Sequence, residues 1–408
     1  MTTLFPSSIT FFMSTPFHNE ASSLLSSLSS SGLFRSLFPV ISRHGPVLET
    51  PSGSLVSFAG NDYLGLSLHP DILSSFCNSA SIYGLGSSSS RLVSGSHEPH
   101  LLFEDSFSIF KGMESSLLFS SGFLANLAAL TVFPDSDTYI FSDERNHASI
   151  IDGCRLSGAR ISIYRHLDTC HLEELLSSSP PDSKKLVVTD SVFSTDGAIA
   201  PLSKISSLCE KYCFLFVVDE AHSTGVMGPG GSGLCSSLPI HPHIQISTLS
   251  KAFGLSGGLI SCSRLFRDLI VNKGRSFIFT TAPPPPLSSA ASVALDLISS
   301  STGDKLRKRL FSNVQSLHSS LLDLGLRVNC YSHIISIRVG DPAVSVNASK
   351  FLLDRGLFIL PFRPPTVPPG KSLLRIVPSA VHDSIHLDHV VDAFSSMKNK
   401  PDFKNIFK

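Results

Sequence analysis

The most distinctive chemical feature of the sequence is Lys251, which lies in the segment 247–258 (STLSKAFGLSGG) among hydroxyl side chains and glycines. A lysine acts as a nucleophile only when its amine is deprotonated and held in place. Burial beside a cationic or hydrogen-bonding site provides both conditions. The hydroxyls of Thr248 and Ser250 can hold a phosphate next to it. An isolated loop lysine is usually solvated, so other groups must support this interpretation.

An acid and a histidine follow another apolar run. Asp219 comes directly after residues 214–218 (FLFVV), and His222 stands three residues further on. A carboxylate at the end of a buried strand either pairs with a cation or is desolvated at high cost. A protonated pyridine nitrogen would be such a cation, and His222 would reach a neighbouring ring substituent. Taken alone, Asp219 is better explained as a cap of the turn that follows it.

Two more segments supply anion-binding and stacking groups. Residues 120–126 (SSGFLAN) form a small-residue turn that opens a helix and presents free backbone N–H groups. His147 can stack on an aromatic ring, although a lone histidine is usually structural. Together, the lysine, the buried acid, the helix start and the histidine describe a site for pyridoxal 5′-phosphate (PLP). In such a site the protein orients the cofactor, and the cofactor performs the carbanion chemistry.

The elements that position these groups are predicted from alternating apolar runs and helical stretches between about residues 60 and 300. This pattern indicates an α/β fold with a mostly parallel sheet covered on both faces, in which chemistry collects at the carboxyl ends of the strands. We expect an N-terminal segment (1–59) that packs on a small domain, a large domain (60–300) and the small α+β domain itself (301–408). Strands are predicted at 138–141, 160–164, 186–189, 214–218, 244–247, 259–262, 334–339 and 357–360.

Three other segments have clear local patterns. Leucines at helical spacing predict a short amphipathic helix at 22–31 and a longer surface helix at 306–321. The four prolines at 283–286 cannot continue a helix or an internal strand, so they predict a rigid turn.

Composition narrows the classes of function. With 42% hydrophobic and 16% charged residues over 408 positions, the chain is expected to bury a large core. Its 32 basic and 32 acidic residues balance, which argues against nucleic-acid binding. The uncharged stretch 115–134 contains a glycine and several polar residues, so we expect a buried helix preceded by a turn and no membrane span. His241 and His243 lack an acid or thiol at suitable spacing, so no metal site is expected.

The first 34 residues contain one charged side chain, Glu20, and no arginine or lysine. Targeting segments generally carry positive charge. We therefore expect a cytoplasmic protein, with organelle targeting by the serine-rich N-terminus as the alternative. Met13 is a second candidate start.

Over about residues 34–389 the chain resembles the α-oxoamine synthase family of PLP enzymes. The resemblance rests on several motifs in the expected order: 60–66 (GNDYLGL), 90–95 (SRLVSG), 146–153 (NHASIIDG), 219–222 (DEAH), 248–251 (TLSK) and 363–368 (RPPTVP). The last motif is similar to that of the family member that opens biotin ring assembly. The resemblance implies the fold of a type I PLP-dependent transferase.

The resemblance also implies roles for the cofactor-binding residues. Lys251 would bind PLP covalently and move the α-proton of the substrate, and Asp219 would pair with the pyridinium nitrogen. Further contacts to the ring and to its phosphate would come from His147, Ser194, His222, Gly122, Phe123 and Thr248. Thr280 or Thr281 would reach the phosphate of the other subunit, so the active unit would be a homodimer.

For the substrates, the resemblance implies that Arg375, with Asn61 nearby, clamps the amino acid carboxylate. A planar guanidinium suits this task because two parallel bonds fix the orientation of the carboxylate. Arg35 and Thr366 would contact the acyl substrate. The expected reaction is a decarboxylative condensation of L-alanine with pimeloyl-CoA or a pimeloyl carrier protein. Relatives usually carry an arginine at the position of Leu373, and this departure bears on the preference for the acyl chain.

The sequence leaves three rival functions to consider. One is another α-oxoamine synthase that condenses glycine with a short acyl-CoA. Another is a catalytically silent partner subunit, which the presence of Lys251, Asp219 and His222 disfavours. A nucleotide-binding oxidoreductase is discounted, because the segment 84–89 (GLGSSS) lacks the third glycine of the dinucleotide motif and follows no clear strand.

Overall fold

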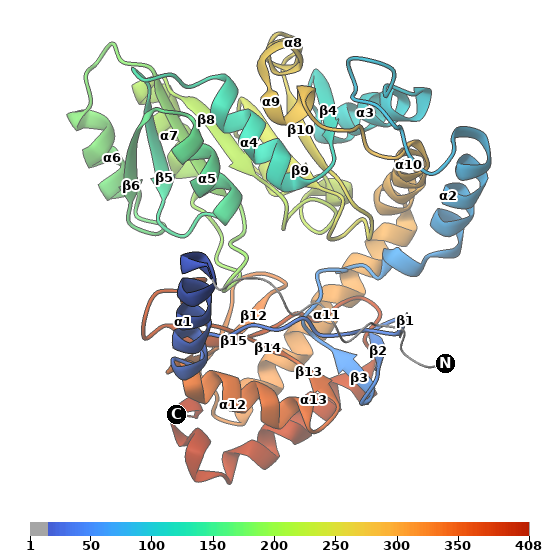
Figure 1. Cartoon of the computed structure of the whole chain (residues 1–408), viewed down its shortest axis with the longest axis vertical. Helices are drawn as coiled ribbons and strands as arrows, with labels where there is room; N and C mark the ends of the chain where they lie inside the picture. Colours follow the sequence, from blue (N-terminus) through green and yellow to red (C-terminus); the bar gives the residue numbers. More distant parts are fainter. Residues whose placement is uncertain (1–14, 408) are drawn as a thin grey trace.

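The computed structural model describes residues 15–407, so the candidate start Met13 lies outside the described residues. Figure 1 shows two regions, one above the other. The upper region is built around the largest sheet, and the lower region contains the N-terminal strands and most of the chain after residue 300. The predicted domain limits at residues 59 and 300 stay a prediction.

The large sheet has seven strands in the order β4-β10-β9-β8-β7-β5-β6. Its strands from β9 to β6 are parallel, and β10 runs antiparallel to both of its neighbours. The predicted mostly parallel sheet is therefore confirmed. The strands are β4 (Ser115–Phe119), β5 (Tyr139–Asp143), β6 (Arg160–Tyr164), β7 (Lys185–Asp190), β8 (Leu215–Asp219), β9 (Ile244–Thr248) and β10 (Gly258–Cys262).

One strand of this sheet was not predicted. The stretch 115–134 was expected to be a helix preceded by a turn, and its first five residues instead form β4, which is buried throughout. The helix α4 follows at Gly122–Val132. The expectation was incomplete because a five-residue run of serine, leucine and phenylalanine has no periodicity that separates a buried strand from a buried helix.

Helices cover both faces of the large sheet. One face packs against α4, α5 (Ala148–Leu156), α8 (Arg264–Lys273) and α9 (Arg275–Ile278), and the other against α6 (Thr169–Ser178) and α7 (Leu202–Tyr212). Three further helices lie together beside the β4 edge in Figure 1: α2 (Pro70–Tyr83), α3 (Glu98–Lys111) and α10 (Pro285–Ser299). The predicted proline turn was partly wrong, because Pro285 and Pro286 open α10, where their missing N–H groups cost nothing.

The lower region contains two four-stranded sheets. One has the order β11-β12-β15-β14 and the other the order β1-β2-β3-β13. Because β3 pairs in parallel with β13, the N-terminal segment shares a sheet with residues near the C-terminus. The strands are β1 (Ser42–His44), β2 (Val47–Thr50), β3 (Gly53–Ser57), β11 (Val328–Cys330), β12 (Ile335–Gly340), β13 (Leu357–Phe358), β14 (Leu360–Phe362) and β15 (Ser372–Ile376).

The remaining helices of the lower region are α1 (Pro16–Ser30), α11 (Ser301–Asp323), α12 (Pro342–Leu353) and α13 (Ser384–Lys398). Short 3-10 helices are η1 (Leu66–Leu68), η2 (Pro229–Gly231), η3 (Cys235–Ser237) and η4 (Pro401–Ile406). The predicted surface helix at 306–321 is part of α11, whose apolar side is buried.

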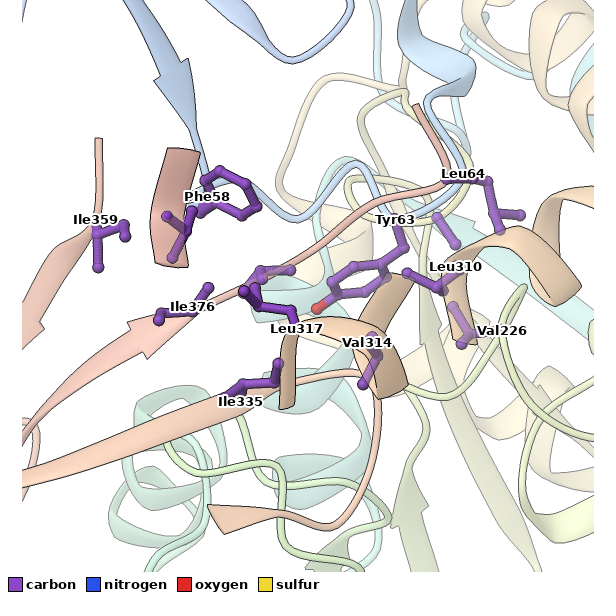
Figure 2. Close-up of a cluster of buried hydrophobic side chains, with 14 of the residues drawn as sticks. Phe58, Tyr63, Leu64, Val226, Leu310, Val314, Leu317, Ile335, Ile359 and Ile376 are labelled. Carbon is purple, nitrogen blue, oxygen red and sulfur yellow. The ribbon is translucent and has the colours of Figure 1, made fainter. Parts of the chain in front are cut away.

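The core joins the lower region to the loop that precedes α2. In Figure 2, Tyr63 lies among Leu310, Val314 and Leu317 of α11, and its ring is fully buried. Because apolar neighbours surround the ring, Tyr63 is fixed in position, and its hydroxyl can be presented accurately to a polar neighbour.

The N-terminal helix α1 begins earlier than predicted, with Thr15 as its N-cap and Pro16 at its first position. None of its residues is buried. The chain after it is held by Arg363, which donates to the backbone oxygens of Gly32 and Phe34. Within residues 15–407, no helix combines the length and the apolar character that crossing a membrane requires. The expected cytoplasmic location stays a prediction.

Candidate active site

Most of the predicted cofactor residues gather at the carboxyl edge of the large sheet. A cavity of about 200 Å³ opens there, which we call the lysine cavity. Seven predicted residues line it: Gly122, Phe123, His147, Asp219, His222, Thr248 and Lys251. Parallel strands bring their carboxyl ends to one edge, so residues that are far apart in sequence meet in this cavity.

Asp219 is the last residue of β8 and is 3% exposed. Its Oδ2 accepts a hydrogen bond from Nδ2 of Asn126 at 2.7 Å, and its Oδ1 accepts one from the backbone N–H of Ala221 at 2.8 Å. Asp190 lies directly beside it in the register of β7 and β8. Burial, and then repulsion by Asp219, raise the pKa of Asp190 well above its usual range. The two carboxylates therefore favour a single negative charge between them.

Lys251 stands in the turn that follows β9. Burial lowers the pKa of its amine to about 8, although the nearby carboxylates of Asp219 and Asp190 act in the opposite direction. The positive charge of Arg375 adds to the lowering. A lysine in this environment has an accessible neutral amine near physiological pH, which is the form that attacks a carbonyl carbon.

The start of α4 forms the anion-binding end of the cavity. Ser121 is the N-cap and accepts a hydrogen bond from the N–H of Leu124. Among residues 15–407, no acceptor is assigned to the N–H groups of Gly122 and Phe123. Thr248 and Ser250 also line the cavity, and their hydroxyls are 2.8 Å apart. Free N–H groups and hydroxyls at a helix N-terminus are the groups that bind phosphate.

A close backbone contact between Gly258 and Gly122 holds the start of α4 against the sheet. A Cβ atom added to Gly258 would lie 2.4 Å from the backbone nitrogen of Gly122, which is closer than any real contact. Only glycine at position 258 therefore lets β10 touch the first residue of α4. This close approach fixes the helix start relative to the sheet.

The two histidines of the cavity have different surroundings. His147 is the N-cap of α5, and its backbone N–H donates to Oδ2 of Asp190 at 2.8 Å. Nδ1 of His222 lies 2.6 Å from the hydroxyl of Tyr63. Burial, and secondarily Lys251, lower the pKa of His222 well below its usual range. His222 is therefore a neutral hydrogen-bonding group at neutral pH.

Arg375 lies on β15 and is 5% exposed. Its Nη2 donates to Oδ1 of Asn61 at 3.0 Å, and the Tyr63 hydroxyl donates to the same oxygen at 3.2 Å. The Nε of Arg375 is buried without a partner among the described residues. A buried guanidinium with an unsatisfied donor is suited to bind a carboxylate.

The other predicted site residues do not line the lysine cavity. Ser194 is half-buried in the loop after β7, and Thr280 and Thr281 follow α9. Arg35 and Thr366 lie together, with Nη2 of Arg35 donating to Oγ1 of Thr366 at 3.3 Å. The structure thus brings the two predicted acyl-contact residues together, outside the lysine cavity. The predicted roles of Ser194, Thr280 and Thr281 stay predictions.

A larger cavity of about 660 Å³, which we call the second cavity, lies between residues 144–146 of the upper region and the loop 364–369. Thr366 is part of its lining, and Lys251 is not. We assign the reaction centre to the lysine cavity in spite of its smaller volume. The reason is that the titratable groups with perturbed pKa values gather there.

Sequence reasoning assigned no role to four residues of the site. Asn126 and Tyr63 stand inside recognised motifs, and Asn126 follows Gly122 by one helical turn, so both could have been found. Asp190 directly follows the strand predicted at 186–189, which is also a usable signal. His333 is fully buried with neither ring nitrogen bonded among the described residues, and it packs edge-on against Tyr63. No local pattern of the sequence indicates that contact.

The residues of the lysine cavity fit PLP. The free N–H groups of Gly122 and Phe123 match a phosphate, and the carboxylate of Asp219 matches a protonated ring nitrogen. Lys251 supplies an amine of lowered pKa in the same cavity. The Gly258 contact leaves no side chain between the helix start and the sheet.

Comparisons with known proteins identify the family of the chain. Residues 54–394 match the aminotransferase class I and II family. The chain is 39% identical to an 8-amino-7-oxononanoate synthase of Anaeromyxobacter dehalogenans over 376 residues, which cover 91% of this chain and 94% of that relative.

Two solved structures extend the comparison. A serine palmitoyltransferase of S. paucimobilis with a bound PLP–myriocin aldimine superposes with a TM-score of 0.88 at 27% identity, covering 93% of this chain and 97% of that one. An 8-amino-7-oxononanoate synthase of Francisella tularensis superposes with a TM-score of 0.72 at 28% identity, covering 84% and 97%.

Fold and site together define a transferase of fold type I, a class that depends on PLP. Within that class, the chain belongs to the α-oxoamine synthase family, as its motifs predicted.

Proposed function

We propose that this chain catalyses the decarboxylative condensation of L-alanine with a pimeloyl thioester, giving 8-amino-7-oxononanoate in biotin biosynthesis. A bond forms between the α-carbon of alanine and the thioester carbonyl carbon. The alanine carboxyl group leaves as CO2, and the carrier leaves as a free thiol. The names of the curated relatives support this reaction, since several 8-amino-7-oxononanoate synthases are 38–40% identical over most of the chain.

We propose PLP as the cofactor, and when bound it supplies an electron sink for the α-carbon of the amino acid. Gly122, Phe123 and Thr248 would hold its phosphate, and Asp219 would pair with its ring nitrogen. The remaining ring contacts come from His147, His222 and Ser194. Among these contacts, the pairing with Asp219 has the strongest structural support. Both oxygens of this buried carboxylate accept hydrogen bonds, and its negative charge would be costly without a cationic partner.

Lys251 would hold the cofactor through its amine and would move the α-proton of alanine. Its lowered pKa supports both tasks, because the neutral amine is a nucleophile and also a base near pH 8. The nearby carboxyl groups of Asp219 and Asp190 favour the protonated form, so the amine can also hold a proton and return it. Efficient proton transfer requires such a match between the pKa and the working pH.

Arg375 binds and orients the alanine carboxylate, with Asn61 positioning the guanidinium. Two charge-assisted bonds fix a carboxylate in one plane. That orientation sets the α-hydrogen against the amine of Lys251, which favours deprotonation over immediate loss of CO2. Arg35 and Thr366, which are in contact with each other, bind the acyl donor.

We propose a homodimer as the active unit, with Thr280 or Thr281 contributing to the phosphate site of the partner. Large apolar side chains on α2, α3 and the segments beside them support this proposal, because a monomer rarely exposes so many. They are Ile82, Leu85, Val93, Leu102, Ile109 and Phe279, each more than half exposed.

The observation that carries the proposal is the placement of Lys251, Asp219 and the start of α4 around one cavity. The decisive experiment supplies the PLP-loaded protein with pimeloyl-CoA and L-alanine labelled either at the carboxyl carbon or at the α- and β-carbons. Mass spectrometry should find the second label in 8-amino-7-oxononanoate and the first label in CO2.

The rivals give different results in the same assay. A preference for glycine and acetyl-CoA would replace the proposal with another α-oxoamine synthase activity. A protein without a borohydride-reducible chromophore and without turnover would be a silent subunit. The Lys251→Ala variant is the matched control, because any product that it forms does not depend on the amine of Lys251.

A further inference from the structure

The β12–β15 strand pair lines the second cavity and carries an unusual set of side chains. In its antiparallel register, Ser336 lies opposite Arg375 and Arg338 lies opposite Leu373. Opposite residues share a face of a sheet, and so do residues two apart on one strand. These four side chains therefore lie on one face, and three of them line the cavity opposite residues 144–146.

Strand geometry sets the distance between Arg375 and Arg338 on this face. Arg375 and Arg338 differ by one two-residue step, about 6.8 Å along the strands, and by one strand spacing of about 4.8 Å. A pimeloyl chain in extended form has a comparable length. If alanine is held at Arg375, an acyl chain joined to its α-carbon can lie along this face and end near Arg338.

Two cations of the second cavity have no carboxylate partner among the described residues. Arg145 is held by Asp196, with Nη1 3.1 Å from Oδ2. Arg338 and Lys371 also line the cavity and are exposed, and among residues 15–407 no carboxylate pairs with either of them. Glu144 also lines the cavity and is exposed. Two unpaired cations against this one carboxylate leave a net positive charge, which favours binding of an anion.

A buried hydroxyl gives an independent indication that a ligand enters here. Ser336 is 1% exposed and lines the second cavity, and its Oγ has no hydrogen-bond partner among the described residues. Leaving a buried hydroxyl unpaired costs free energy, so such a group generally has a partner in the functional state.

We propose that the second cavity takes the acyl chain of the donor and that Arg338, assisted by Lys371, binds the carboxylate at the far end of that chain. Leu373 would contact the methylene groups between the two arginines. A guanidinium at position 373 would lie on the same face, directly opposite position 338. This inference rests on the proposed function and adds a residue that selects dicarboxylic acyl donors.

The test compares pimeloyl-CoA with heptanoyl-CoA, which has the same chain without the terminal carboxylate. Arg338→Leu should lower kcat/KM for pimeloyl-CoA roughly 10-fold, the effect of losing one hydrogen bond to a charged group, and leave heptanoyl-CoA unchanged. Calorimetric titration of the PLP-loaded protein with pimeloyl-CoA should show a matching loss of affinity. Arg264→Leu, which removes an exposed arginine from α8 outside the cavity, is the control and should change neither donor.

A second variant tests the cross-strand placement. Adding Leu373→Arg to Arg338→Leu returns a guanidinium to the same face and should restore the preference for pimeloyl-CoA. A double variant as weak as Arg338→Leu counts against the placement. Equal losses for both donors would mean that Arg338 binds the CoA part of the donor, and unchanged kinetics would mean that it binds neither; both results overturn the inference. A wild-type chain that turns over neither donor would instead overturn the proposed function.

Discussion

The lysine cavity and the second cavity differ in how their charged groups are held. In the lysine cavity, Asp219 is buried with both oxygens hydrogen-bonded, and His222 is buried against the hydroxyl of Tyr63. In the second cavity, Arg338 and Lys371 are exposed and unpaired among the described residues. Groups that set a pKa must be fixed in a low-dielectric place, whereas groups that recognise the end of a flexible chain can remain in contact with water.

The two cavities also depend on different parts of the chain. The lysine cavity is built from strand ends of the seven-stranded sheet and from the start of α4. The second cavity is built largely from the β11-β12-β15-β14 sheet and the loop 364–369. Changes in the first should therefore affect the rate with every acyl donor, and changes in the second should affect the choice of donor.

The largest effect is expected from Lys251→Ala. The variant should fold with an unchanged circular dichroism spectrum and lose at least about 10³-fold in kcat, since no other amine lines the lysine cavity among the described residues. It should also lack a borohydride-reducible chromophore. Full turnover by this variant would refute the assignment of Lys251.

Asp219→Asn should lower kcat by about 10²- to 10³-fold, in line with the loss of one partner from a buried charged pair. The amide also presents a donor where the Nδ2 of Asn126 needs an acceptor. Asp196→Asn is the matched control from the second cavity and should change kcat by less than about threefold, because its ion pair with Arg145 is partly exposed. Steady-state rates with saturating alanine measure both. Equal losses in the two variants would remove the distinction between the cavities.

Arg375→Ala should raise the KM for alanine by about 10- to 100-fold, the range expected for losing charge-assisted hydrogen bonds to a carboxylate. The KM for pimeloyl-CoA should change by less than about twofold. The measurement is a pair of steady-state titrations with each substrate varied in turn. A similar rise in both constants would mean that Arg375 has a structural role, through its contact with Asn61.

The smallest effect is a pH dependence that belongs to the lysine cavity alone. Because the pKa of Lys251 is lowered to about 8, the neutral amine is the minor form below pH 8 and the major form above it. The rate at which cofactor-free protein captures PLP should rise about tenfold per pH unit below pH 8 and level off above it. Stopped-flow absorbance follows this capture. A rate that continues to rise toward pH 10 would indicate an ordinary solvated lysine.

Much of the site could be predicted from sequence because strand ends and helix starts are local patterns. Lys251 and Asp219 each follow a predicted strand, Gly122 stands at a predicted helix start, and the sheet topology then brings them to one edge. The partners that tune them could not be assigned in this way. The contact between Tyr63 and His222 joins residues that are 159 positions apart, and it depends on how α11 packs beneath the loop.

The fold was predicted less completely where local patterns are ambiguous. Strand β4 shares one uncharged stretch with α4, and α1 begins six residues before the predicted start at residue 22. Ser336 stands in a strand that was predicted, but its unpaired hydroxyl and its alignment with Arg375 depend on strand register. Register follows from tertiary packing and turn geometry, which no short segment encodes by itself.

The register that sets Arg338 against Leu373 has a consequence for how such enzymes are compared. Two sequences can carry the same positive charge at the same point in space while an alignment records a loss at one column and an unrelated gain at another. Inventories of specificity residues made column by column will miss exchanges of this kind. Counting side chains by the sheet face that they share would recover them.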